Sequence, residues 1–575
     1  MRENNRKTIA SIRKLSQFTI MNVIDGQAGL ESYSSLIFYS LTINNILNIV
    51  ILLILAGISI STLTNTGIFQ KAKDAKKASE NAQKEEDKLI SEYEKEIIKQ
   101  DAEGIWDGNV NKPDLMSGMM AIKFTEPTDS TEGKDEKVSD SSKNDWYNYS
   151  EKKWANAKTN DGSMWVWIPR YAYKINKSNQ TFDVVFLVGT TDNYYDKDGK
   201  LQTAKRQKSE TDIPDATKDY VVHPAFTNES NIGYVNGGWK KELTGIWVSK
   251  FEAGYFDKNL VDADKEKYSS SVNYSQTYGY TTAEKNEDAR NYLDGVYGSK
   301  TTAIKYPTFQ GGKYSMNYIN HNDAFNISKA IAGDSNNIYG LKSNSTDSHL
   351  IKNSEWGAVA FLGQSQYGLY NKNIRINNVN MGDNSHFVYA MTGYAAKEED
   401  AANTTNTDAI AWNQTGGELA STTGTIYGIY DMSGGTWERS ASLVNNGNSR
   451  LNEFGSSLMY SLKDGKSSEY VTVYETDTSV DNTGVSWTDE NLLKTNEANY
   501  KKNTKYGDAI KETSTAGTGN TSWNGGYSHF AGLSYPFFSR GGDCWDRGGA
   551  SLFYFYRFDG GINCIGGFRS VLVAQ

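Results

Sequence analysis

The chain has 575 residues and a formal net charge of −9 at pH 7, and 12% of its residues are aromatic. The acidic balance argues against a nucleic-acid-binding protein, because phosphate binding needs a concentrated basic face. Two cysteines are too few for a disulfide-stapled secreted scaffold. The five histidines are scattered without zinc-ligand spacing, so we expect them to be solvated or core side chains.

The N-terminal part predicts a membrane anchor. Residues 46–63 are uncharged and apolar, and with their flanks they predict a transmembrane helix over residues 45–66. Residues 1–44 are basic, which by the positive-inside rule places them in the cytoplasm and the rest of the chain outside. A signal peptide is the competing interpretation, but the apolar run is long and no A-x-A cleavage site follows it. We therefore expect a single-pass protein of the cell membrane with an extracellular body.

A helical stalk is predicted after the span. Alanines and larger apolar residues recur at three- and four-residue spacing through Lys/Glu-rich sequence over residues 67–104. This helix is either a solvated spacer or a pairing helix through which the chain oligomerises. Residues 46–86 also resemble the N-terminal helix of type IV pilin-like proteins of low-GC Gram-positive bacteria. The processing site of that family, a glycine followed five residues later by a glutamate, has no counterpart at residues 41–45.

The body, residues 105–575, has the pattern of a sheet-containing fold with long loops. Residues 125–145 are polar and predict a loop. Beyond Trp146, short aromatic or β-branched runs such as residues 164–169 and 181–189 alternate with polar turns, and we interpret them as strands. The long connections are rich in Asn, Gly, Ser and Thr. The expected fold class is therefore α+β with much irregular loop.

Six motifs follow one another along this body. They are MWVWIP at 164–169, GIWVSKFE at 245–252, SEWGAVA at 354–360, YDMSGGTWE at 430–438, RGG at 540–542 and GFR at 567–569. Their order resembles the formylglycine-generating-enzyme-like (sulfatase-modifying factor) branch of the C-type-lectin fold. The resemblance implies that residues 105–575 form a C-type-lectin-like body.

Most motif residues are expected to maintain the fold. Glycine permits backbone turns barred to other residues, which suits the pairs Gly434-Gly435 and Gly541-Gly542. Trp356 and Trp437 are predicted core anchors. Arg540 and Arg569 are predicted to pair with Asp431 or Glu438 and so to fix the C-terminal strands.

The resemblance also raises an enzymatic alternative. Formylglycine-generating enzymes hold copper with a close cysteine pair, and thiolates suit Cu(I). Cys544 and Cys564 are not in that sequence context, and they are open to three interpretations: unpaired thiols, a disulfide, or a metal or catalytic pair. Members of the family also bind calcium near the YDMSGGTWE segment, which leaves Glu438 as a calcium candidate, with Gly435 where the family has Asn. We otherwise expect no cofactor and no catalysis.

The C-terminal segment predicts a ligand-binding function. Residues 543–565 contain no Lys, Glu, Gln or Met, and apart from Trp545 they match the residues that a mutagenised Asn codon can encode. This resembles the variable proteins of diversity-generating retroelements, which use the same fold, and it implies a variable ligand-binding region within residues 540–569. The expected contact residues are Asp543, Cys544, Trp545, Asp546, Arg547, Tyr554, Tyr556, Arg557, Phe558, Asp559 and Asn563.

If residues 553–556 form a strand, Phe553 and Phe555 should point inward and Tyr554 and Tyr556 outward. The alternative, that these aromatic side chains only pack the core, stays open. The expected partner is an unidentified protein or glycan at the cell surface. The competing functions are a pilin-like structural component of the surface and a formylglycine-generating-type oxidase.

Overall fold

The computed structural model describes residues 110–139, 145–209, 211–254, 307–317, 319–332, 338–380, 390–399, 404, 407–480, 488–563 and 565–575. These residues belong to one compact unit, Ile98–Gln575. The predicted membrane span and stalk, residues 45–104, lie outside the described residues. Within the described ranges, no helix combines the length and the apolar character that a membrane crossing requires.

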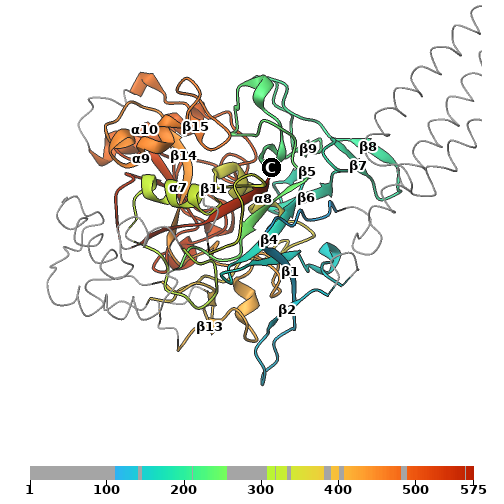
Figure 1. Cartoon of the computed structure of the whole chain (residues 1–575). Coiled ribbons are helices and arrows are strands. Elements are labelled where there is room, and N and C mark those ends of the chain that lie inside the picture. The colour runs from blue at the N-terminus through green and yellow to red at the C-terminus, as the bar shows by residue number, and fades with distance from the viewer. Residues whose placement is uncertain are drawn as a thin grey trace, which may run out of the picture. The chain divides into compact units, whose positions relative to one another are not determined.

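A seven-stranded antiparallel sheet takes in the C-terminal strand as the second strand from one edge, and Figure 1 labels its strands β11, β4, β1 and β2. Its order is β11-β21-β10-β4-β3-β1-β2, so β21 lies between β10 and β11 although it comes last in the chain. Every residue of β4 and β10 is buried, because both faces of the sheet are covered. The strands are β1 (Met119–Phe124), β2 (Asp135–Lys137), β3 (Asn156–Thr159), β4 (Met164–Pro169), β10 (Gly245–Ser249), β11 (Thr346–Leu350) and β21 (Ser570–Ala574).

A second seven-stranded sheet is built largely from the last third of the chain. Its order is β15-β14-β18-β19-β17-β16, and β20 pairs with β14 in parallel. All eight residues of β14 are buried. The strands are β14 (Trp437–Val444), β15 (Thr472–Tyr474), β16 (Thr518–Gly519), β17 (Ser528–His529), β18 (Phe537–Arg540), β19 (Phe555–Phe558) and β20 (Gly566–Phe568).

Three small sheets and four described α-helices complete the unit. The sheets are β6-β5-β9, β7-β8 and β12-β13. Their strands are β5 (Tyr171–Asn176), β6 (Thr181–Phe186), β7 (Asn193–Tyr195), β8 (Leu201–Thr203), β9 (Val221–Val222), β12 (Tyr394–Ala395) and β13 (Ile410–Ala411). The helices are α7 (His321–Ala330), α8 (Asn353–Gly363), α9 (Arg450–Tyr460) and α10 (Asp489–Lys502).

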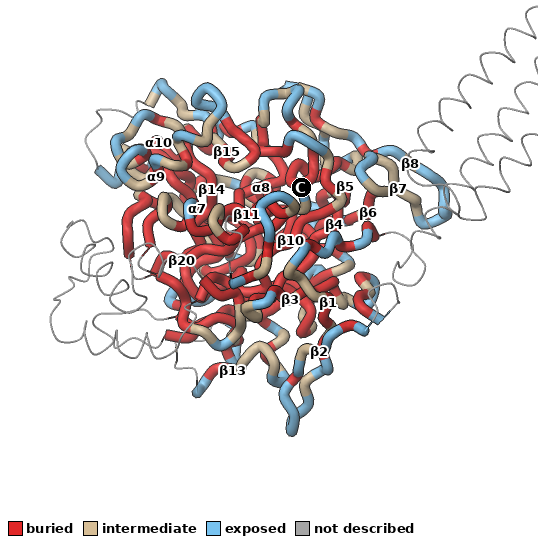
Figure 2. The backbone as a smooth tube through the Cα atoms, in the orientation of Figure 1, coloured by how far each residue is buried: buried red, intermediate tan, exposed pale blue. Residues whose placement is uncertain are grey.

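Helix α8 lies at the centre of the unit. All its residues are buried, and it contacts β4 of the first sheet and β14 of the second. Figure 2 shows the same arrangement, with buried chain around α8 and exposed chain toward the outside, in loops, in β8 and in part of α10. The Glu355 carboxylate accepts the backbone N–H of Lys352 at 2.9 Å and so caps the helix. The mixed α+β class is confirmed, as are strands within 164–169 and 181–189.

One buried ion pair joins the two large sheets. Arg569, between β20 and β21, donates from Nε to Glu438 Oε2 at 2.6 Å and from Nη2 to Oε1. The same guanidinium donates to the carbonyls of Ser249 at 3.0 Å and Tyr430 at 2.9 Å, and it lies 5.8 Å from the Trp356 ring centroid. Ser249 ends β10 and Glu438 is in β14, so one side chain bridges both sheets.

Arg540 does not make the predicted pair with Asp431 or Glu438. Its guanidinium donates to the backbone carbonyls of Asp508 at 2.9 Å and Ala509 at 3.2 Å. Arg569 already occupies both carboxylate oxygens of Glu438, so Arg540 of the RGG motif fixes the loop at Asp508 and Ala509 instead.

We expect Arg569→Ala to lower the free energy of unfolding by about 3–5 kcal/mol, because Glu438 would be left buried without its charged partner. Arg450→Ala is the matched control. Its carboxylate partner Asp559 lies at 2.7 Å, but both side chains are partly exposed, at 27% and 18%. That variant should lose about 1 kcal/mol or less. Denaturant unfolding of both variants measures the difference, and equal losses would contradict the bridging role of Arg569.

Candidate ligand-binding face

The C-terminal segment leaves β18 through a double-glycine turn. Gly541 and Gly542 have φ of +85° and +80°, a conformation that disfavours side chains. A Cβ on Gly542 would also come within 2.9 Å of Ala550 Cα, so the turn packs directly against the backbone at Ala550 and leaves no room for a side chain. The predicted turns at Gly434 and Gly435 are confirmed in the same way, with φ of +80° and +74°.

Two carboxylates hold the loop that follows. Asp543 Oδ1 accepts the backbone N–H groups of Trp545 at 2.8 Å and Asp546 at 3.1 Å. Asp546 Oδ2 accepts the backbone N–H of Asp543 at 3.0 Å and Trp437 Nε1 at 2.9 Å. Burial and the neighbouring carboxylate raise the pKa of Asp543 well above its usual value. This bracing leaves Trp545, 38% exposed, and Arg547 on the outside.

Strand β19 presents two half-buried side chains beside aromatic neighbours. It pairs antiparallel with β18 along all four of its residues and pairs in parallel with β17 at Phe555. Tyr556 stacks on Trp437 with ring centroids 5.0 Å apart, and its ring edge contacts His529 at 5.2 Å. The Arg557 guanidinium lies 4.6 Å from the Tyr535 ring centroid. The strand therefore presents one accessible aromatic and one accessible arginine side chain, each packed on an aromatic neighbour.

The prediction that Tyr554 points outward is wrong. Tyr554 is 1% exposed, because β19 begins only at Phe555 and the Tyr554 hydroxyl bonds to the Asp546 side chain. Its ring also stacks on Tyr556 at 6.0 Å. Phe553 and Phe555 are buried as predicted.

Four other predicted contact residues are also buried. They are Asp543, Cys544, Phe558 and Asn563, each 7% exposed or less. Arg439 lies 4.4 Å above the Phe558 ring and 3.5 Å from Asn563 Oδ1, which explains their inward position. The accessible part of the predicted set is therefore Trp545, Asp546, Arg547, Tyr556, Arg557 and Asp559.

Three side chains of the face were missed by sequence reasoning. Tyr527, His529 and Tyr535 precede the RGG motif yet contact Tyr556 or Arg557. Residues 527–530 read Tyr-Ser-His-Phe, which does not alternate between polar and apolar residues, so no sequence pattern singled out the first two.

Cys544 is a free, fully buried thiol. Burial, with the nearby carboxylates of Asp543 and Glu252, raises the pKa of this thiol well above its usual value. The thiolate form is the nucleophile and the metal ligand, so these surroundings favour the unreactive form. Cys564 lies outside the described residues.

Three buried carboxylates lie behind the face, and protein donors occupy them all. Glu252 accepts from Ser315 Oγ, Thr436 N and Thr436 Oγ1, and Asp431 accepts from Gly393 N and Asn377 Nδ2. Both oxygens of the calcium candidate Glu438 bond to Arg569, so the structure gives this residue a different role. Across the ranges that the structure describes, no group of three or more His, Cys, Asp or Glu residues could hold a metal ion.

Burial makes this cluster sensitive to pH. It raises the pKa of Glu438 to about 7, against the opposing effect of Arg569. Burial, followed by the charges of Asp431 and Glu438, raises the pKa of Glu252 well above its usual value. Glu355 shows the opposite direction, since Lys352 and His349 outweigh burial and lower its pKa.

We expect Glu252→Gln to stabilise the protein relative to the parent increasingly as the pH rises from about 5 to 8. A neutral Glu252 is favourable below the unfolded pKa, and this contribution is lost as the pH rises toward the raised folded pKa, by about 1.4 kcal/mol per unit. Glu355→Gln is the control of opposite sign, and its window lies lower: the contribution of the Glu355 carboxylate is fully present above its unfolded pKa of about 4.5 and is lost only as the pH falls below it. Unfolding curves across this range would contradict the idea if the Glu252→Gln difference were constant.

No protein-family model matches this chain, and no curated protein matches it. The interpretation of the face therefore rests on its own residues and geometry.

Proposed function

We propose that this chain is a membrane-anchored, surface-displayed ligand-binding protein whose C-terminal segment is the variable region of a diversity-generating retroelement. The proposed body is C-type-lectin-like, of the formylglycine-generating-enzyme-like branch. In support, the six motifs occupy elements that meet in one core, including β4, β10, α8 and β20. The anchoring part of the proposal rests on residues 45–66 and their basic flank.

One observation carries the proposal: accessible aromatic and arginine side chains stand on a backbone that is held in place, by pairing with β18 in the strand and by the Asp543 carboxylate in the loop. Tyr556 and Arg557 lie on a strand between two others, and Trp545 and Arg547 lie on a braced loop. Aromatic and arginine side chains supply most of the energy at protein-binding surfaces. A rigid backbone lowers the entropic cost of binding.

The burial pattern divides the segment into two roles. Tyr554, Phe555 and Phe558 pack inward and belong to the framework. Arg547, Tyr556 and Arg557 are the positions whose side chains can change without opening a cavity. Trp545 is exposed, but an Asn codon mutated at its adenines does not encode Trp, so it is a fixed contact in this proposal.

We expect simultaneous Arg547→Ser, Tyr556→Ser and Arg557→Ser substitution to lower the free energy of unfolding by no more than about 2 kcal/mol. The matched variant Tyr554→Ser, Phe555→Ser and Phe558→Ser should not fold, because each buried aromatic contributes about 3–5 kcal/mol. Circular dichroism and thermal unfolding compare the two. Loss of the fold in the first variant would show that these side chains are structural.

The DNA beside the gene tests diversification directly. A near-copy of the region encoding residues 543–565 should lie close to a reverse-transcriptase gene, and the two copies should differ at template adenines. Differences at the codons of Arg547, Tyr556 and Arg557, with identity at those of Phe555 and Phe558, are the expected pattern. A flank without such a copy would contradict the retroelement assignment but not ligand binding.

A further inference from the structure

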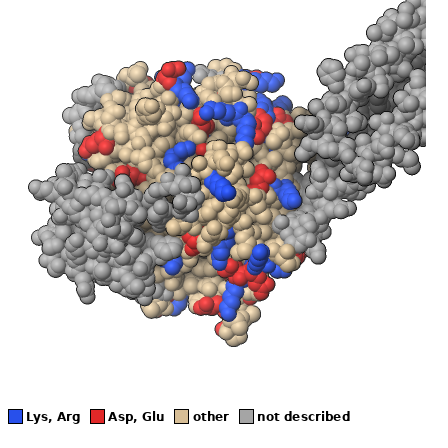
Figure 3. All heavy atoms as spheres, in the orientation of Figure 1, with Lys and Arg blue, Asp and Glu red and all other residues tan. Residues whose placement is uncertain are grey.

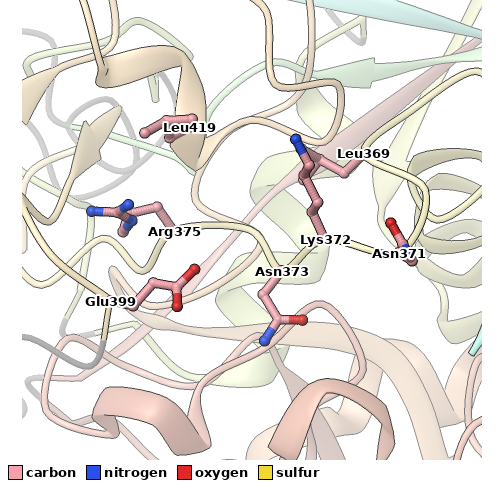
Figure 4. A pocket seen from close by; sticks show the side chains of 7 residues that line it. All are labelled: Leu369, Asn371, Lys372, Asn373, Arg375, Glu399 and Leu419. Carbon is pink, nitrogen blue, oxygen red and sulfur yellow. The ribbon is translucent and has the colours of Figure 1, made fainter.

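A polar groove runs beside the C-terminal segment. It consists of two adjoining pockets of about 370 and 160 Å³ that share Asn373, Arg375 and Glu399. Figure 4 shows the larger one, with Lys372, Asn373 and Arg375 on the 369–376 segment and Glu399 and Leu419 supplied by other parts of the chain. The smaller pocket extends the groove to Arg547 and Leu552.

The two walls of the groove come from different parts of the chain. One wall is residues 371–376, and the other is residues 547–552 within the proposed variable region. Ile376, Ala396 and Ala550 form a small buried apolar cluster that joins them. The Tyr527 N–H also donates to the Gly549 carbonyl at 3.1 Å and holds the second wall. The groove is therefore formed before any ligand arrives.

The groove carries more positive than negative charge, although the chain is acidic overall. Lys372, Arg375 and Arg547 line it against the single carboxylate of Glu399. On the face shown in Figure 3, by contrast, positive and negative side chains are interspersed. Lys372 and Arg547 are exposed, and neither forms an ion pair within the described part of the chain. Arg375 donates from Nη1 to the Ala396 and Lys397 carbonyls, which orient its guanidinium.

The backbone at Arg547 does not explain the choice of arginine. Its φ is +47°, in the left-handed region that favours Gly or Asn, and its side chain makes no hydrogen bond to the other described residues. An arginine in this strained backbone conformation thus makes no hydrogen bond among the described residues that would stabilise the fold in exchange. This favours a role for its guanidinium in binding rather than in folding.

We propose that this groove binds a carboxylate-bearing peptide segment of the ligand, between Arg547 on one wall and Lys372 and Arg375 on the other. This inference rests on the proposed function and names the chemistry of its ligand. A guanidinium fork matches a carboxylate in two hydrogen bonds, and the amides of Asn371 and Asn373 add further donors. Leu369, Leu419 and Leu552 add apolar lining, which suits a peptide with acidic and aliphatic side chains.

The test measures fluorescence anisotropy of a labelled, end-blocked hexaglutamate peptide on the full-length chain in detergent. We expect binding that weakens as NaCl rises from about 50 to about 500 mM. Arg547→Gly should weaken it about 3- to 10-fold while leaving the melting temperature unchanged or higher, because glycine suits the positive φ. Lys372→Gln should weaken binding too. Glu399→Gln, the matched control, should strengthen it by removing a repelling carboxylate.

Three results would overturn the proposal: equal binding of hexaglutamine, binding of an oligogalacturonate but not of hexaglutamate, or an affinity unchanged by Arg547→Gly. The second result would assign the groove to acidic glycans instead. The proposed function has separate tests, the serine variants and the flanking DNA, so it can stand when this inference fails.

Discussion

The contact between Arg569 and Glu438 is the constraint on which the rest of this structure depends. A buried charge is tolerated only when its partners are complete, and Arg569 meets that condition with one carboxylate and two backbone carbonyls. Those partners lie in β14, at the end of β10 and in the YDMSGGTWE turn, so the guanidinium fixes both sheets relative to the C-terminus. The segment between RGG and GFR is thereby held at both ends. Arg569 anchors its C-terminal end, and the turn of Gly541 and Gly542 fixes its N-terminal end.

Loops elsewhere in the body are held by the same kind of contact. Lys250 is fully buried, and its ammonium donates to Asn156 Oδ1 and to the carbonyls of Ile426 and Gly428. Lys352 donates in the same way to the carbonyls of Gly237 and Glu469. Irregular backbone leaves carbonyls without sheet or helix partners, and buried cationic side chains satisfy them. This explains how a body with long loops keeps a single arrangement.

The sequence could predict what depends on local pattern. The strands at 164–169 and 181–186 and the glycine turns follow from residue type and spacing. The pairing of Arg569 with Glu438 is one of several arginine–carboxylate pairs that the motifs leave open. Arg540 and Tyr554 could not be placed, since their positions depend on partners distant in the chain or on where a strand begins. Arg540 meets the Asp508 and Ala509 carbonyls, and Tyr554 is drawn in by Asp546. Tyr527 was missed because the adjoining strand β17 has two residues, too short for a periodic signal, and Tyr535 was missed because it lies in the connection between β17 and β18.

The burial pattern also constrains how the proposed face would recognise its ligands. Among the described residues, only three proposed variable positions are accessible: Arg547, Tyr556 and Arg557. Substitution at these positions therefore changes a limited part of the contact area. The opposite wall of the groove, with Lys372 and Arg375, lies outside the C-terminal segment and keeps its charge whatever the variable positions become. A fixed cationic wall would select ligands that bear an anionic group. The side chains at the three proposed variable positions would then discriminate among those ligands by shape and aromatic contact. Recognition of anionic ligands as a class and discrimination between individual ligands would thus depend on different walls of one groove.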